Sequence, residues 1–391
     1  MSQTATTARP RLVTPQFAML GVAALAYFFA DGLLVPSVPL YVTGPLASSD
    51  VSVGMAVGAF SLSALLLRPW AGRFADRRGR STVMIFGGLV FAASVAGYSL
   101  ADSVAMLVAL RLLTGVGEAF FFVGAVTAMS DLAPAERRGE AISLFSLSLY
   151  VGLAVGPPLG EAVVGAIGFG TVWVFSSCAA VLSVVLASRV GDTREPGPTE
   201  SGGRLIHPAA VVPGLLLLAL VWGMAGFLAF VPLYALDLGL AGAGPLMFVF
   251  AGIVVVIRSI GARIPDRLGA ARSVRLALSC CAIGLAIIGS WRAVPGLAIG
   301  TVVLGVGIAF GTPAIMMLAL QGIPAAERGA VMGTVSMSID LALGLGPATF
   351  GLVAAGLDRS TGFLTAALVA TAGFLLASRT THRSAALQSG G

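Results

Sequence analysis

Three ionisable residues in the first third of the sequence lie inside long apolar stretches: Asp31, Arg111 and Glu118. If such stretches cross a membrane, a carboxylate near the bilayer centre costs about 2.5–3.5 kcal/mol or more. The cost falls if the group binds a proton, faces a water-filled cavity or meets a cation. Asp31 and Glu118 are therefore candidates for exchanging protons and for contacting a substrate. The alternative is a structural role in which each charge is satisfied by a neighbouring helix.

Arg111 and Glu118 are separated by seven residues, which is about two helical turns and places them on nearly the same helix face. Either they belong to one buried charge network, or each reaches a different partner. The simpler interpretation is an ion pair that stabilises the helix. The functional one is that Glu118 takes up and releases protons while a nearby Arg111 favours its charged form.

Asp340 is the one acid that lies deep in an apolar stretch of the second half of the sequence. The position that corresponds to it in the first half carries Tyr150, which is also polar and a candidate for facing a cavity. Structural and functional interpretations of Asp340 stay equally open. The predicted proton-coupling residues are Asp31, Arg111, Glu118 and Asp340.

Aromatic side chains accompany the two acids of the first half. Tyr27 precedes Asp31 by one turn, and Phe121 and Phe122 follow Glu118 closely. They could line a pocket for a flat lipophilic cation, because aromatic faces attract cations, although aromatic residues that face lipid are the common alternative. The predicted substrate-binding set is Asp31, Tyr27, Glu118, Phe121, Phe122, Tyr150, Trp222, Phe230 and Asp340, with Trp222 and Phe230 as the weaker members.

Composition identifies the elements that must position these residues. The chain has 391 residues, of which 57% are hydrophobic and 10% charged, too apolar for an ordinary water-soluble protein. In lipid, only helices or closed barrels satisfy every backbone group, and the long apolar runs without alternation select helices. The expected spans are 15–42, 51–71, 81–101, 104–130, 140–165, 168–189, 209–236, 241–261, 273–291, 294–320, 329–356 and 361–379.

The basic residues indicate the topology. All 23 are arginines, and they lie in short connections rather than on one face, so nucleic acid is not an expected partner. Twenty of them lie on the side that also holds both termini, and only Arg292 and Arg359 lie on the opposite side. This asymmetry predicts that both termini are cytoplasmic. Without lysine there is no Walker-type phosphate loop, so the energy source must be a gradient or a partner chain. No metal site and no cofactor are expected.

The sequence repeats itself at a constant offset of 190 residues. Residues 68–79 match 258–269, residues 115–120 match 305–310, and residues 156–157 match 346–347. This pattern indicates a duplication of six spans. The counterparts of Arg111 and Glu118 at this offset are Thr301 and Ile308, and that of Asp31, at an offset of 193, is Met224. The duplicated scaffold alone therefore does not require those three charges. The predicted organisation is a six-helix bundle over 1–189, a linker over 190–207, a second bundle over 208–380 and a tail over 381–391.

Residues 68–80 form a dense cluster of charge between two apolar runs, with two glycines that predict a tight turn. Asp76 among arginines would suit a breakable ion-pair latch between the halves, and Asp266 would suit a matching one. The competing explanation is that the arginines only hold the connection in the cytoplasm. In a later span, Gly152, Gly156, Pro157 and Gly160 predict close helix approach with a bend. The predicted gating residues are Gly72, Arg73, Asp76, Arg77, Gly79, Arg80, Asp266, Arg267, Gly152, Gly156, Pro157 and Gly160.

Taken together, these motifs resemble the major facilitator superfamily, and the resemblance covers nearly the whole chain. The run Gly72-x3-Asp76-Arg77-x-Gly79-Arg80 is similar to that family's signature between spans 2 and 3, with Ser81 in place of a common basic residue. Arg111-x2-Thr114-Gly115 resembles a second motif, and it implies a proton-linked role for that arginine. The resemblance implies a twelve-span transporter.

The stretch Gly152-x3-Gly156-Pro157-x2-Gly160 is similar to the motif of drug:proton antiporters, although Leu144 and Glu161 depart from its first and last glycines. We therefore expect a proton-coupled exporter of small lipophilic compounds, cationic ones included, that works by alternating access as a monomer in the cell membrane. A sugar or metabolite efflux permease or a proton symporter is the alternative. A membrane-embedded enzyme is a remote one, because no clustered nucleophile and base stand at membrane depth. Glu161 is a further candidate for a gate, against a simple position at the exposed rim.

Overall fold

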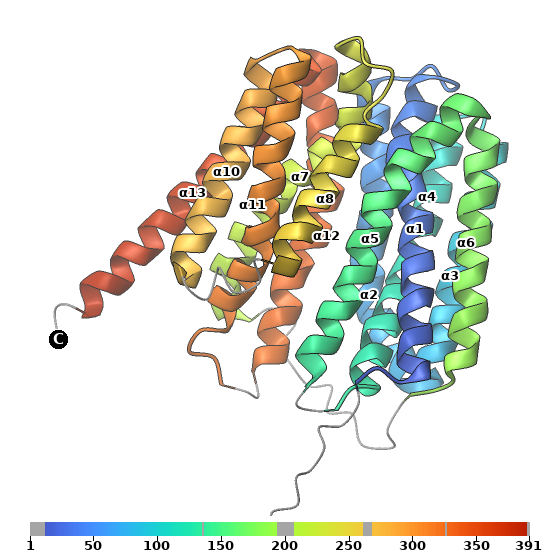
Figure 1. Ribbon diagram of the computed structural model, residues 1–391, viewed down its shortest axis with the longest axis horizontal. Helices are drawn as coiled ribbons and strands as arrows, with labels where there is room; N and C mark the ends of the chain where they lie inside the picture. Colours follow the sequence, from blue (N-terminus) through green and yellow to red (C-terminus); the bar gives the residue numbers. More distant parts are fainter. Residues whose placement is uncertain (1–11, 135–136, 194–206, 261–267, 325–326, 389–391) are drawn as a thin grey trace, which may run out of the picture.

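The computed structural model of the chain describes residues 12–134, 137–193, 207–260, 268–324 and 327–388 (Figure 1). These residues form twelve α-helices and two short 3-10 helices, and no strand occurs among them. The prediction of an all-α polytopic protein is confirmed. The α-helices are α1 Pro15–Thr43, α2 Asp50–Arg78, α3 Arg80–Gly97, α4 Val104–Asp131, α5 Arg138–Ala166, α6 Phe169–Val190, α7 Val211–Asp237, α8 Gly244–Ile260, α10 Ala270–Ser290, α11 Val294–Leu320, α12 Arg328–Gly356 and α13 Arg359–Gln388.

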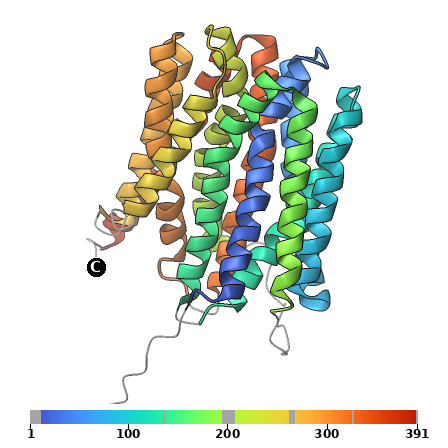
Figure 2. The same ribbon diagram turned by 45° about the vertical axis from the view of Figure 1, so that its right-hand side comes forward.

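Length and hydropathy agree with a membrane location. Eleven of the described helices are long and apolar enough to cross a bilayer, and the described part of α8 is a shorter apolar helix. Most of the helices run roughly side by side and form a helical bundle in both views (Figures 1 and 2). Each turn of these helices satisfies its own backbone groups, which a hydrocarbon environment demands.

The helices gather in two groups (Figure 1). The first group is α1 to α6, in which α1 packs on α5 and α6, and α3 packs on α4. The second is α7 to α13, in which α10 packs on α11 and α13, and α12 packs on α7. Between the groups, α2 contacts α12, α5 contacts α8, and α1 contacts α7. The predicted boundaries of the two bundles and of the linker stay a prediction.

The cluster of charge at residues 68–80 is not the tight turn that the sequence predicted. α2 continues through it to Arg78, so Gly72 lies inside the helix, and only Gly79, with φ 103°, breaks the chain before α3. The basic residues Arg77 and Arg78 stand in the last turn of α2, where they interact favourably with the negative end of the helix dipole. Arg77 and Arg78 therefore stabilise α2, which runs through the cluster of charge and does not end before it.

Small residues allow the close approach that was expected for α5. A Cβ added at Gly156 would lie 2.6 Å from the Cα of Gly32, and one added at Gly152 would lie 2.6 Å from the backbone of Phe28. Such distances leave no room for any side chain, so α5 and α1 meet backbone to backbone. Pro157 lies inside α5 at this contact.

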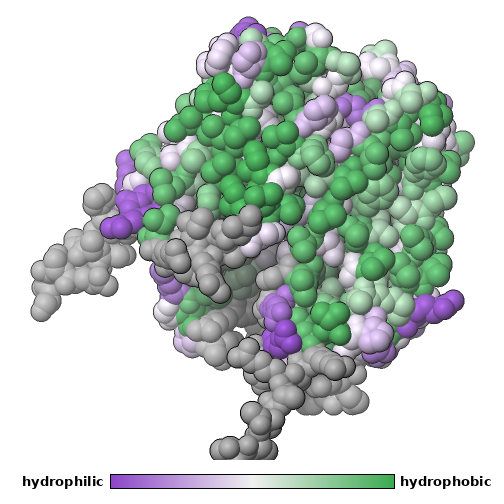
Figure 3. All heavy atoms as spheres, in the orientation of Figure 1, coloured by the Kyte–Doolittle hydropathy of each residue, from purple (hydrophilic) through white to green (hydrophobic). Residues whose placement is uncertain are grey.

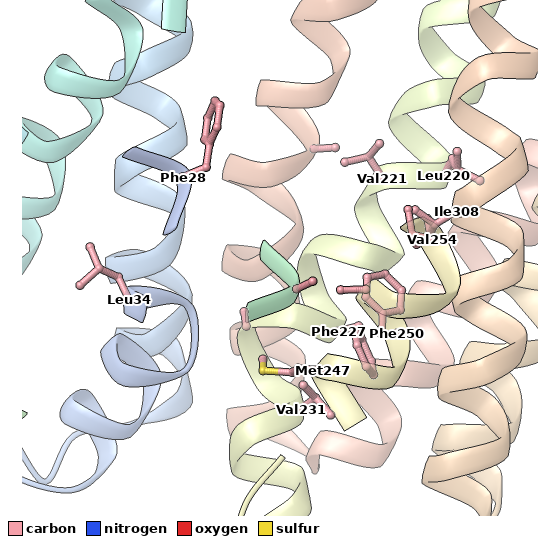
Figure 4. Close-up of a cluster of buried hydrophobic side chains, with 14 of the residues drawn as sticks. Phe28, Leu34, Leu220, Val221, Phe227, Val231, Met247, Phe250, Val254 and Ile308 are labelled. Carbon is pink, nitrogen blue, oxygen red and sulfur yellow. The ribbon is translucent and has the colours of Figure 1, made fainter. Parts of the chain in front are cut away.

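An apolar cluster fills the second group between α7, α8 and α11 (Figure 4). Phe227 and Phe250 lie with ring centroids 5.2 Å apart. Ile308, the duplicated counterpart of Glu118, is 2% exposed and lies beside Val254 in this cluster. In the second half, the position that corresponds to Glu118 therefore carries a buried aliphatic side chain.

Candidate functional site

Two helices of the first group, α1 and α4, carry three of the four predicted proton-coupling residues. Asp31 follows the start of α1 by about 24 Å, and Glu118 follows the start of α4 by about 21 Å, at 1.5 Å per residue. Both residues therefore lie near the middle of their helices. The end of the molecule at which α1 begins and α2 ends is called the arginine-rich end below, because it carries Arg77 and Arg78.

Glu118 is 7% exposed, and its Oε2 atom is buried without a hydrogen-bond partner among the described residues. It interacts electrostatically with Asp31, Arg68 and Asp340. The hydroxyl of Tyr27 is also buried without a hydrogen-bond partner and interacts with Glu118. The Tyr27 hydroxyl and the charges of Asp31, Arg68 and Asp340 thus surround this carboxyl group, so a small change of rotamer or of protonation can change its partner.

An ion pair that is largely buried joins the two groups of helices. Arg68 Nη2 of α2 lies 2.9 Å from Asp340 Oδ1 of α12, and the Asp340 side chain is 4% exposed. The guanidinium of Arg68 also lies over the ring of Phe122, at 4.5 Å. Asp340 is among the predicted site residues, but Arg68 is not, because the sequence groups it with the arginines in or beside the connection that follows span 51–71. Its place ten residues before the end of α2 puts it about 15 Å inside the helix.

Arg111 does not pair with Glu118 in the described structure. Arg111 is 6% exposed, and it donates from Nε to the carbonyl oxygen of Ala56 at 3.1 Å and from Nη1 to the hydroxyl of Tyr98 at 3.5 Å. Its guanidinium lies 4.6 Å from the ring centroid of Phe60, and it interacts electrostatically with Asp31. The sequence left open whether Arg111 and Glu118 belong to one charge network or reach different partners. In the structure they reach different partners.

A second arginine connects the groups at the position equivalent to Arg68. The guanidinium of Arg258 on α8 lies 4.1 Å from the ring centroid of Tyr150 on α5. Arg258 is the duplicated counterpart of Arg68, and Tyr150 is that of Asp340. Each half thus sends one arginine toward the same position of the other half. One of them meets a carboxylate and the other meets an aromatic ring.

The end opposite the arginine-rich end is held together by a different set of contacts, which we call the outer clasp. Glu161 of α5 accepts hydrogen bonds from the backbone N–H groups of Ala243, at 2.8 Å, and of Gly244, at the start of α8. Arg359 of α13 lies 2.8 Å from Asp50 of α2 and 2.7 Å from Asp237. A carboxylate at a helix N-terminus and an arginine between two acids both stabilise the approach of the two groups.

The molecular face between the two groups is hollowed toward the arginine-rich end (Figure 3). The contacts described above lie at the outer clasp and at the depth of Arg68 and Arg258.

The predicted aromatic residues divide into two sets. Tyr27 and Phe121 are fully buried and stacked on each other, with ring centroids 3.8 Å apart, and Phe230 is buried against Phe350 at 4.4 Å. These three rings pack within their own helix groups. Phe122, Tyr150 and Trp222 are only partly buried, and the first two lie against the arginines at the boundary between the groups.

The charged cluster at the end of α2 pairs within the first group. Arg80 lies 2.6 Å from Asp76 and 3.1 Å from Asp131 of α4. Asp266 and Arg267, the expected second latch, lie outside the described residues. A latch between the two halves stays a prediction.

A model of the Major Facilitator Superfamily matches residues 20–347. The chain belongs to this superfamily. It is 28% identical over 372 residues to an uncharacterised MFS-type transporter of Salmonella typhimurium, covering 90% of this chain and 92% of the relative. The membership makes the protein a multi-pass membrane transporter and not an enzyme.

Solved structures show the same fold at low identity. A POT family transporter in complex with a thioalcohol-conjugated peptide superimposes with a TM-score of 0.81 at 12% identity, covering 94% of this chain and 96% of that one. The human organic anion transporter MFSD10 (TETRAN) superimposes with a TM-score of 0.71 at 19% identity, covering 93% of this chain and 100% of that one. Among the described residues, no group of three or more His, Cys, Asp or Glu residues could hold a metal ion.

Proposed function

We propose that this chain exports small lipophilic organic compounds from the cell in exchange for protons, by alternating access. The termini and the arginine-rich end lie in the cytoplasm in this proposal, as the distribution of arginines predicts. Membership of the superfamily establishes transport. The direction of transport, its coupling to protons and the class of substrate are what we propose.

One observation carries the proposal. Arg68 bonds to Asp340 across the two helix groups at 2.9 Å, while Glu118, with a buried oxygen that lacks a partner, lies within its electrostatic reach. Arg68 thus interacts with two acids, Asp340, which it contacts directly, and Glu118, which it reaches only electrostatically. Because a proton neutralises either acid, protonation decides which of them holds the arginine.

This sharing couples protons to movement. When Asp340 is ionised, its bond to Arg68 holds α2 against α12. A proton on Asp340 removes the charge that Arg68 needs, and Arg68 is then free to turn toward Glu118. The α2–α12 contact weakens, so the two groups can rock apart at this depth. Asp31, which interacts with both Arg111 and Glu118, transmits the change to α1.

Substrate-driven proton flux in proteoliposomes tests the mechanism. The variants are Asp31→Asn, Glu118→Gln and Asp340→Asn, each of which removes a charge with little change of shape. We expect each to reduce coupled proton movement at least tenfold while substrate binding persists. Asp102→Asn is the control, because Asp102 is exposed in the connection before α4. Unchanged coupled flux in all three variants would sink the proposal.

A further inference from the structure

Arg258 holds a positive charge between the two helix groups, and no acid among the described residues is paired with it. Its guanidinium stacks on the ring of Tyr150. Its Nε and Nη2 atoms are buried, and neither has a hydrogen-bond partner among the described residues. The residue as a whole is only partly buried, so part of its side chain reaches the surface.

The two unpaired atoms lie on one edge of the guanidinium. The N–H bonds of Nε and Nη2 point in the same direction, and this edge binds a carboxylate through two parallel hydrogen bonds. Leaving donors of a charged group buried and unpaired costs more than leaving neutral ones unpaired. The edge therefore fits a planar oxyanion better than water or a neutral acceptor.

The duplication shows what is missing from the chain itself. Arg68 occupies the equivalent position in the first half and pairs with Asp340 of the second half. At the position equivalent to Asp340, the first half has Tyr150 in place of an acid. The ring attracts the face of the guanidinium and Tyr150 also interacts electrostatically with Arg258, but it supplies no carboxylate, and Nε and Nη2 stay without a partner among the described residues. One arginine of the duplicated pair is neutralised by the protein, and the other is not.

We propose that Arg258 binds an anionic group of the transported compound, with a carboxylate as the fitting chemistry. The guanidinium edge forms the two hydrogen bonds, and Tyr150 holds the guanidinium plane from the opposite helix group. This inference rests on the proposed function and restricts its substrates to organic anions with an apolar body. A purely cationic substrate is repelled at this position.

Binding to the purified full chain at one fixed pH, without a membrane gradient, tests the inference. The probes are benzoate, octanoate and 1-naphthaleneacetate, each compared with its neutral amide, and 1-naphthylmethylammonium as the cation. We expect at least one carboxylate to raise the unfolding temperature and to bind at least tenfold more tightly than its amide. If no carboxylate exceeds its amide, or if the ammonium compound binds best, the inference is wrong.

Variants assign the binding to the guanidinium edge. Arg258→Gln should weaken carboxylate binding at least tenfold, and Arg258→Lys should recover only part of it because lysine lacks the paired donors. Arg272→Gln is the matched control, since Arg272 is an exposed arginine of α10. Equal carboxylate affinity in Arg258→Gln and in the wild type would overturn the assignment.

A substitution at Tyr150 separates lost binding from lost folding. Tyr150→Asp installs at α5 the acid that Asp340 supplies to Arg68. We expect this variant to fold at least as stably as the wild type and to lose carboxylate binding, because the new acid occupies the guanidinium edge. A Tyr150→Asp protein that still binds carboxylates with wild-type affinity contradicts the inference.

Failure of this inference is distinguishable from failure of the proposed function. Carboxylate binding at fixed pH and substrate-driven proton flux are measured separately on the wild type and on Arg258→Gln. Carboxylate selectivity without substrate-driven proton flux would support Arg258 as an anion site and refute proton exchange. The reverse pattern would keep proton exchange and remove Arg258 from the substrate site.

Discussion

Replacing Arg68 and replacing Asp340 should lower the free energy of unfolding by different amounts. The side chain of Arg68 is 25% exposed, whereas that of Asp340 is 4% exposed. Arg68→Met leaves a carboxylate buried without its cation, and breaking a buried pair in this way costs about 3 kcal/mol or more. Asp340→Leu leaves an arginine that keeps its contact with Phe122 and can reach solvent, so we expect a cost of about 1 kcal/mol.

The double variant Arg68→Met/Asp340→Leu replaces the pair by apolar side chains and should lie close to the wild type. At about 2 °C per kcal/mol, the unfolding temperatures should fall by about 6 °C for Arg68→Met and about 2 °C for Asp340→Leu. The cost of Arg68→Met should also shrink as pH falls, because a proton on Asp340 removes the uncompensated charge.

Thermal unfolding of the purified protein in one detergent, followed by tryptophan fluorescence, measures all four members of this cycle. Two results refute the reasoning. One is an Arg68→Met variant that is no less stable than Asp340→Leu at neutral pH. The other is a double variant whose loss equals the sum of the single losses, since the two residues then do not act as a pair.

Two further predictions concern the outer end. Arg359→Gln removes the cation of the outer clasp and should raise labelling of Ser52→Cys by a membrane-impermeant thiol reagent at least threefold, while Arg292→Gln, whose side chain is 59% exposed, should not. Asp358 accepts hydrogen bonds from the backbone and hydroxyl of Thr361, both at 2.7 Å, which lower the pKa of the carboxyl below its ordinary value of 3.8. Its stabilising effect is therefore present above that value and lost as pH falls through the lower folded value, so Asp358→Ala should lower the unfolding temperature at pH 7 but not well below pH 3.8.

The sequence predicted the fold because lipid imposes a strong and local constraint. Twelve apolar stretches, each of helical length, require no knowledge of which helix packs on which. The constant offset of 190 residues then related the halves, and it drew attention to Asp31, Arg111 and Glu118 as charges without counterparts. All three lie in helices at intermediate depth, as expected.

The partners of these residues were not predictable in the same way. Arg68 falls within the predicted span 51–71 but is counted with the arginines in or beside the following connection, whereas α2 continues to Arg78, seven residues beyond the predicted end. The bond to Asp340 depends on the rotation of two helices that are far apart in the sequence, which hydropathy does not encode. Glu161 was considered for a gate but could not be connected with the start of α8, because its partners are backbone N–H groups without a side-chain signal.

Arg68 and Arg258 occupy equivalent positions in the two halves, yet they have different partners in the opposite half. Both halves supplied an arginine at the same position, and identical partners would have given two equivalent ion pairs. Arg68 meets the carboxylate of Asp340, whereas Arg258 meets the ring of Tyr150. Of these two contacts between the helix groups, only the first therefore pairs the arginine with an acid. A neutral crossing responds to protons, because its strength depends on the charge of an acid. A crossing with an uncompensated cation responds to an anion from outside the chain. In the mechanism proposed above, the divergence at this single pair of positions separates proton sensing at α2–α12 from substrate binding at α5–α8, within one pseudo-symmetric scaffold.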